Sequence, residues 1–398
     1  MKKIFNNSFY LLPLALLVGI FVRYSSHADI NVRKIDPAEW SKQTQTPIDR
    51  TETKEAKKIK LALLLDTSGS MDGLIDQAKS QLWTIVNELA AAKCEGAKPE
   101  VQIALYEYGN DGLPASEGYI RLVTPLTNDL DKLSQDLFGL RTNGGSEFCG
   151  HVIQTACRQL DWSADGGDLQ IIFIAGNEPF TQGSVNYQLA CAEAKRKNIV
   201  VNTIFCGNFQ EGMNTSWKSG ADLTSGTYAS IEQNSKTVFI PSPYDDKIDR
   251  LNTQLNNTYI EYGTEGVKKK EMQTRQDAES ESYGAENKVN RAVSKSTHVY
   301  KNKSWDMVDA AEDKSFDVTK VTKDQLPDTM KTMTNDQKKT YVKQKTVERE
   351  KIKTEIQDLN KKRTEYLLAQ KKDSKENMLD KSMINAIKTQ AEKKKFTF

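Results

Sequence analysis

Short apolar runs alternate with segments of helical periodicity between residues 58 and 262. The run from Lys60 to Leu65 ends in Asp-Thr-Ser-Gly-Ser, the pattern of a strand that is buried on both faces and followed by a turn. From Leu74 to Leu89, apolar residues recur every three or four positions, as on one face of a helix. The alternation continues, with strands expected at 101–106, 119–123, 169–175, 199–205 and 227–231 and helices at 147–160, 185–197 and 245–259. This order predicts an α/β domain over 58–262, with a mostly parallel central sheet and helices on both faces.

The pattern changes after residue 262. Residues 263–300 are charged and poor in apolar side chains, which predicts a linker. Within 301–398, apolar positions recur at helical spacing from Ile352 to Tyr366 and from Leu379 to Ile387. We therefore expect an α-helical C-terminal tail over 301–398 that folds as a helical hairpin with a coiled-coil seam. One long solvated helix is the alternative.

The N-terminus has the layout of a bacterial secretory signal. Lys2 and Lys3 precede an apolar run over 9–22, and Ser-His-Ala at 26–28 provides the small residues of a cleavage site. The run is shorter than the roughly 20 residues that a spanning helix needs. We expect 1–28 to be a signal peptide, 29–57 a polar linker, and the protein to be exported to the periplasm or cell surface. An uncleaved N-terminal segment that tethers the protein to a membrane is the alternative.

Charge is distributed unevenly along the chain. The formal net charge of +2 over 398 residues excludes a strongly basic nucleic-acid binder. Residues 29–262 nevertheless carry a net −9, whereas 263–398 carry a net +8. Opposite signs predict an electrostatic contact between the two halves, within one molecule or between copies, that loosens with added salt. Two independent solvated surfaces are the alternative.

The chemistry-bearing motif lies directly after the first expected strand. Asp66, Ser68 and Ser70 follow one another at every second position on a tight turn, so that a carboxylate and two hydroxyls converge above the strand end. Oxygen ligands of this kind suit a hard cation such as Mg²⁺. Open α/β sheets bind their ligands at the carboxyl ends of the strands, which is where this turn lies.

At these residues the chain resembles the von Willebrand factor type A (VWA) domain family, over 58–262. The resemblance implies a Rossmann-like fold and a metal-ion-dependent adhesion site. In the family this site combines D-x-S-x-S from the first strand with a Thr from a second loop and an Asp that ends the fourth strand. The first part matches as Asp66, Ser68 and Ser70. Ser146, which ends Asn-Gly-Gly-Ser, stands for the Thr.

The third part of the motif departs from the family. Where the family has T-D-G-E-P, this chain has Ala-Gly-Asn-Glu-Pro at 175–179, so Gly176 replaces the expected Asp. We expect Glu147, Asn177 or Glu178 to substitute for the missing carboxylate, directly or through water, in a weak Mg²⁺ site. Restoring the carboxylate by Gly176→Asp is expected to tighten cation binding. The alternative is a vestigial site that binds no metal.

The resemblance implies a function in recognition. We expect a non-enzymatic, adhesion- or scaffold-like protein that binds another protein through the loop rim around Asp66. A structural scaffold whose basic helical tail holds the partner is the alternative.

A second alternative is an enzyme, such as a hydrolase, but the residues that catalysis needs are poorly represented. A serine nucleophile needs a nearby base, and beyond residue 28 only His151 and His298 remain. His151 lies two positions after Cys149 on an expected helix, a spacing that points the two side chains to different faces. The chain also lacks the glycine motifs of phosphate-binding loops.

All five cysteines lie in the acidic half of the chain, where export would allow oxidation. In the family's fold, right-handed crossovers place the helices that carry Cys157 and Cys191 on one face of the sheet. Cys149 and Cys206 are both expected near the loop rim. We therefore expect Cys149–Cys206 and Cys157–Cys191 disulfides, with Cys94 unpaired. Five reduced thiols in the core are the alternative.

Overall fold

The computed structural model describes residues 56–232, 234, 240–370 and 379–398. The expected signal peptide at 1–28 and nearly all of the expected linker at 29–57 lie outside these residues. The described residues form one compact unit. None of the helices in the described ranges has the length and apolar character needed to cross a bilayer.

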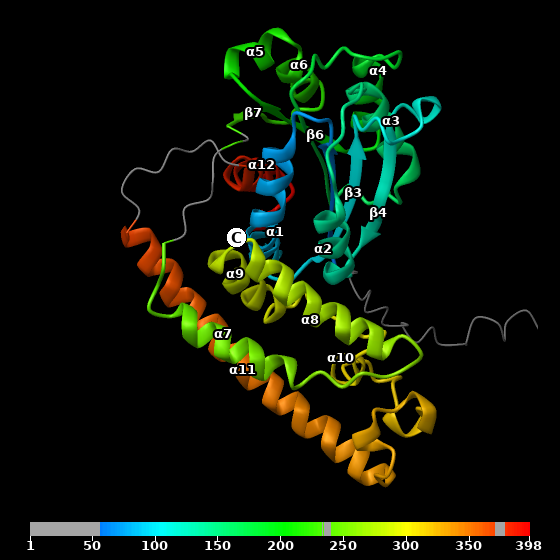
Figure 1. Ribbon diagram of the computed structural model, residues 1–398, viewed down its shortest axis with the longest axis vertical. Coiled ribbons are helices and arrows are strands. Elements are labelled where there is room, and N and C mark those ends of the chain that lie inside the picture. Colours follow the sequence, from blue (N-terminus) through cyan, green and yellow to red (C-terminus); the bar gives the residue numbers. More distant parts are fainter. Residues whose placement is uncertain (1–55, 233, 235–239, 371–378) are drawn as a thin grey trace, which may run out of the picture. The chain divides into compact units, whose positions relative to one another are not determined.

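A six-stranded sheet forms the centre of the N-terminal half (Figure 1). Its spatial order is β4-β3-β1-β5-β6-β7, and only β4 runs antiparallel to its neighbour. The strands are β1 (Lys58–Asp66), β3 (Glu100–Tyr108), β4 (Ile120–Thr127), β5 (Leu169–Gly176), β6 (Val200–Cys206) and β7 (Tyr228–Ile231). The predicted α/β class with a mostly parallel central sheet is confirmed.

Helices cover both faces of the sheet, because successive side chains of a strand point to opposite sides. Leu61, Leu63 and Leu65 of β1 pack into one apolar cluster, whereas Ala62 and Leu64 pack into the other. The first cluster lies under α1 (Asp72–Ala91) and α2 (Leu130–Gly139), and the second under α3 (Cys149–Gln159), α4 (Tyr187–Arg196) and α6 (Trp217–Asp222). A short helix, α5 (Phe209–Asn214), precedes α6.

The expected disulfides do not form, and all five cysteines are buried without a disulfide bond. Cys149 and Cys206 belong to the clusters on opposite faces, so the sheet separates them. Cys157 and Cys191 do share one cluster, on the helices α3 and α4 that pack together, as the crossover argument predicts. Their proximity is therefore confirmed, but their thiols are not joined.

The segment expected as a linker, 263–300, instead folds into α8 (Gly266–Ser282) and α9 (Ala285–Lys295). Two of the charged side chains that suggested a solvated linker lie inside the protein. Arg291 and Lys295 are almost completely buried and form ion pairs with Asp277, at 2.5 and 2.9 Å. Paired charges can be buried where isolated ones cannot, so composition alone gave the wrong prediction.

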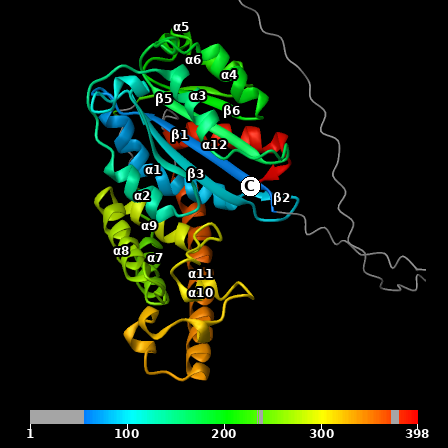
Figure 2. The same ribbon diagram turned by 90° about the vertical axis from the view of Figure 1, so that its right-hand side faces the viewer.

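The last two helices also differ from the expected hairpin (Figures 1 and 2). The long helix α11 (Asn335–Gln370) packs mainly on α7 (Asp245–Asn256), α9 and the short α10 (Met307–Ala310). The final helix, α12 (Leu379–Lys393), packs instead on α1 and on strands β5, β6 and β7. The helix expected at 245–259 corresponds to α7, which packs on α11 and α9. The sheet face beside α1 is covered instead by α12.

Smaller elements complete the chain. The two-residue strands β2 (Lys93–Cys94) and β8 (Phe396–Thr397) pair antiparallel, which fastens the C-terminus to the end of α1. The 3₁₀ turns of the described residues are η2 (Ala115–Glu117), η3 (Val318–Lys320), η4 (Lys323–Gln325) and η5 (Asp328–Met330). The last three lie beside the N-terminal part of α11, where a separate small core includes Met307, Met330 and Val342.

Candidate cation-binding site

The D-x-S-x-S turn lies at the carboxyl end of β1. Asp66, the last residue of β1, is fully buried, and its Oδ1 accepts a hydrogen bond from the Ser68 backbone N–H at 2.7 Å. The hydroxyls of Ser68 and Ser70 lie 3.3 Å apart. The Asn177 amide, just after β5, donates to the Ser70 hydroxyl at 3.2 Å. The first and third loops therefore meet, as the alternating pattern predicted.

Glu147 approaches Asp66 from the second loop. A Cβ atom placed on Gly109 would lie 2.8 Å from both Asp66 Oδ1 and Glu147 Cγ, so the two side chains lie against the same glycine. Gly109 has a φ of +78° and follows β3. A Cβ on Gly145 would in turn lie 2.2 Å from the Gly109 carbonyl oxygen. These two glycines bring the second loop close enough for Glu147 to reach Asp66.

Hydrogen bonds hold Glu147 in this position. Its backbone N–H donates to Gln182 Oε1 at 2.5 Å, and its Oε2 accepts from the Glu178 backbone N–H at 3.3 Å. Only 3% of Glu147 is exposed. Glu178 itself is exposed and contributes its backbone to the site.

The electrostatics of the site leave negative charge without a partner. Burial and the neighbouring Glu147 carboxylate raise the pKa of Asp66 well above its usual value. Among the described residues, Asp66 Oδ2 accepts no hydrogen bond, and neither does Asn177 Oδ1, although both atoms are buried. No described lysine or arginine forms an ion pair with Asp66 or Glu147. Two carboxylates, two hydroxyls and an amide oxygen fit a hard divalent cation such as Mg²⁺.

Gly176 and Tyr108 account for the departure from the family motif. The Tyr108 side chain is fully buried, and its hydroxyl donates to the Ala175 carbonyl oxygen at 3.0 Å. A Cβ on Gly176 would lie 2.5 Å from this hydroxyl and 3.0 Å from Asp66 Oδ2. The tyrosine therefore fills the space that a side chain at position 176 would need.

The structure thus brings together most of the residues singled out in the sequence: Asp66, Ser68, Ser70, Glu147, Asn177 and the backbone of Glu178. Ser146 is half-buried and makes no hydrogen bond to these residues within the described part of the chain. The described residues contain no group of three or more His, Cys, Asp or Glu side chains arranged to hold a metal ion. Any cation site must therefore use hydroxyl and amide oxygens beside the two carboxylates.

Sequence reasoning missed Tyr108, Gly109 and Gln182. Gly109, three residues after the strand expected at 101–106, was a readable signal of close backbone approach. Tyr108 had no such signal, since an aromatic residue at the end of a strand usually belongs to the core.

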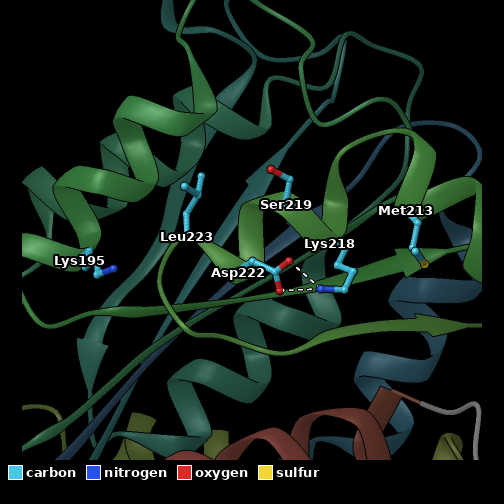
Figure 3. Close-up of a pocket in the computed structure, with 6 residues that line it drawn as sticks. All are labelled: Lys195, Met213, Lys218, Ser219, Asp222 and Leu223. Carbon is cyan, nitrogen blue, oxygen red and sulfur yellow. Dashed lines mark hydrogen bonds and ion pairs between the residues drawn. The ribbon is translucent and has the colours of Figure 1, made fainter.

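A separate surface pocket of about 500 Å³ lies over α4, α5 and α6 (Figure 3). Its lining comprises Lys195, Met213, Lys218, Ser219, Asp222 and Leu223. Lys218 and Asp222 pair with each other at 2.6 Å, which neutralises both charges. It shares no lining residue with the Asp66 site.

Comparison with known proteins agrees with this architecture. Residues 60–215 match the model of the von Willebrand factor type A domain. Comparison with curated proteins gave no match. Similar solved structures include the SpRpn10 VWA domain, with 17% identity and a TM-score of 0.34 over 44% of this chain and 87% of that one. BatB from Bacteroides thetaiotaomicron shows 16% identity and a TM-score of 0.34, over 44% and 91%. The pilus adhesin SpaC from Lactobacillus rhamnosus GG shows 13% identity and a TM-score of 0.33, over 45% and 28%.

Proposed function

We propose that this protein is an exported, non-enzymatic binding protein that recognises another protein through the loop rim around Asp66, with Mg²⁺ at that site. VWA domains are typically interaction domains, which supports the general class. The observation that carries the proposal is the buried Asp66 oxygen that lacks a partner beside the Glu147 carboxylate, at the open end of the strands. Export rests on the N-terminal sequence alone.

The residues of the rim suit binding better than turnover. Asp66, Ser68, Ser70 and Asn177 would supply oxygen atoms to the cation, which in turn would offer a positive centre to a partner. One thiol close to the site, Cys149, lies 3.9 Å from the Tyr108 hydroxyl, and burial raises its pKa well above the usual value. A thiol that stays protonated is a poor nucleophile.

Calorimetric titration of the full chain with Mg²⁺ tests the cation part of the proposal. We expect one weak site in the wild type and none after Asp66→Ala, because this change removes the carboxylate at the centre of the site. Equal heats for the two proteins would contradict the proposal. They would favour the alternative, a metal-free scaffold that binds its partner through the basic helices.

A further inference from the structure

The third loop cannot supply the missing carboxylate. An aspartate at position 176 needs a Cβ atom, and that atom would lie 2.5 Å from the hydroxyl of the fully buried Tyr108. This hydroxyl is held by its hydrogen bond to the Ala175 carbonyl oxygen. Tyr108 therefore occupies the space that an aspartate at position 176 would need. The glycine at 176 and the buried tyrosine at 108 fit each other.

A carboxylate is nevertheless present on the other side of Asp66. Glu147 is nearly as deeply buried as Asp66, and the two side chains pack against the same glycine, Gly109. These two adjacent carboxylates lie away from water, and no described lysine or arginine pairs with either. Burying unpaired charges raises the free energy of the folded state. A bound proton or a bound cation removes that cost. Asp66 Oδ2 and Asn177 Oδ1, which are buried and accept no hydrogen bond among the described residues, favour the cation.

We propose that Glu147, from the second loop, replaces the missing third-loop carboxylate, so that Asp66 and Glu147 together hold one divalent cation. This inference rests on the cation of the proposed function but not on its protein partner. Asn177 donates a hydrogen bond to the Ser70 hydroxyl at 3.2 Å, and its amide oxygen is buried without a hydrogen bond among the described residues.

The test compares Mg²⁺ binding by the full-length wild type, Glu147→Gln and Glu211→Gln. Glu211→Gln is the matched control, because it makes the same chemical change on an exposed side chain outside the site. We expect Glu147→Gln to raise the Mg²⁺ Kd at least about 10-fold, the scale of losing a group that supports a metal site. Glu211→Gln should keep the wild-type Kd. An unchanged Kd in Glu147→Gln would overturn the assignment.

Thermal melting separates this role from a purely structural one. Without added cation, Glu147→Gln should melt no lower than the wild type, because it removes repulsion between two buried carboxylates. The rise in Tm that Mg²⁺ causes in the wild type should disappear. A lower Tm in Glu147→Gln with an intact Mg²⁺ response would show that Glu147 only supports the loop. If Glu147→Gln does not fold, Glu147→Asp serves instead: it keeps the charge, and a Kd equal to that of the wild type would contradict direct ligation.

Two further results keep this inference distinct from the proposed function. If Asp66→Ala abolishes binding and Glu147→Gln does not, this inference fails while the cation of the proposed function stands. If the wild type binds no Mg²⁺, both fail.

Discussion

At the level of single residues, the pairing of Tyr108 with Gly176 reverses one expectation from the sequence. The family pattern suggests that Gly176→Asp would restore a ligand and tighten cation binding. The position of the Tyr108 hydroxyl, 2.5 Å from where the new Cβ would lie, predicts instead a loss of stability. Overpacking of this kind costs about 1–3 kcal/mol.

Urea unfolding of Gly176→Asp, alone and combined with Tyr108→Phe, measures this cost. We expect the single change to lower the free energy of unfolding and the double change to recover part of the loss, because Phe lacks the obstructing hydroxyl. A Gly176→Asp protein as stable as the wild type, with tighter Mg²⁺ binding, would show that the third loop can still accept the ligand.

Most residues of the candidate site could be predicted from local sequence. The contacts that could not be predicted have a physical explanation. Asp66, Ser68 and Ser70 follow from a turn after a strand, which is a local property. The contact of Glu147 with Asp66 depends on two glycines, Gly109 and Gly145, that bring separate loops together. A contact between segments so far apart in the chain leaves no periodic pattern in the sequence from which it could be predicted.

At the level of elements, α12 covers the sheet face beside α1, and its apolar face should be important for stability. Ile387 and Met383 are buried against the same cluster as α1 and the sheet. We expect Ile387→Ala to lower the free energy of unfolding by about 2–5 kcal/mol, as for other large-to-small core changes. Leu368→Ala on α11 is the control, because 67% of Leu368 is exposed, and should change stability by less than about 0.5 kcal/mol. Equal effects of the two changes would show that α12 is not packed as described.

Helices α8 and α9 depend on buried ion pairs, which gives their stability a pH dependence. Burial by itself would raise the pKa of Asp277, but Lys295 and Arg291 outweigh burial and hold this pKa well below its usual value. Below about pH 4 the unfolded chain therefore takes up a proton at this residue that the folded chain does not. The stabilisation is complete above that pH and is lost as the pH falls towards the lowered pKa.

Asp277→Asn tests this pH dependence. At pH 7 it should lower the free energy of unfolding by about 3 kcal/mol, because two buried cations lose a partner. The difference from the wild type should shrink progressively as the pH falls below about 4, because only the unfolded wild type takes up a proton at Asp277 in this range. A difference that stays constant over this range would contradict the ion-pair explanation.

The sequence predicted the type of these elements better than their partners. The strands and the helices of the sheet follow the hydrophobic pattern. The linker and hairpin predictions failed because buried ion pairs and the packing of α12 on the sheet involve residues far apart in the chain.

At the level of the whole molecule, the two halves of opposite charge do contact each other, but not mainly through salt-sensitive pairs. Ion pairs such as Lys269–Asp129 and Lys388–Glu88 join them at partly exposed positions, each worth about 0–1 kcal/mol. The apolar cluster beneath α1 also includes residues of α9, α11 and α12, so the halves share one core. Added salt should therefore not separate them.

A fragment of residues 58–262 is accordingly expected not to fold by itself. Removing 263–398 would expose the face of α1 and the sheet that α9 and α12 cover. We expect the fragment to lack a cooperative urea transition, whereas the full chain should show one. A fragment with the unfolding midpoint of the full chain would establish an independent domain and contradict the shared core.

The most direct test of the proposed function is photo-crosslinking in the native host with a photoreactive amino acid at position 178 on the rim. A second protein with the amino acid at position 361, an exposed site on α11, is the control. We predict a covalent adduct with another protein that forms at position 178, disappears when divalent cations are chelated and is lost in Asp66→Ala. An adduct that forms only at position 361, or one at position 178 that neither chelation nor Asp66→Ala affects, would contradict recognition through a cation at this rim.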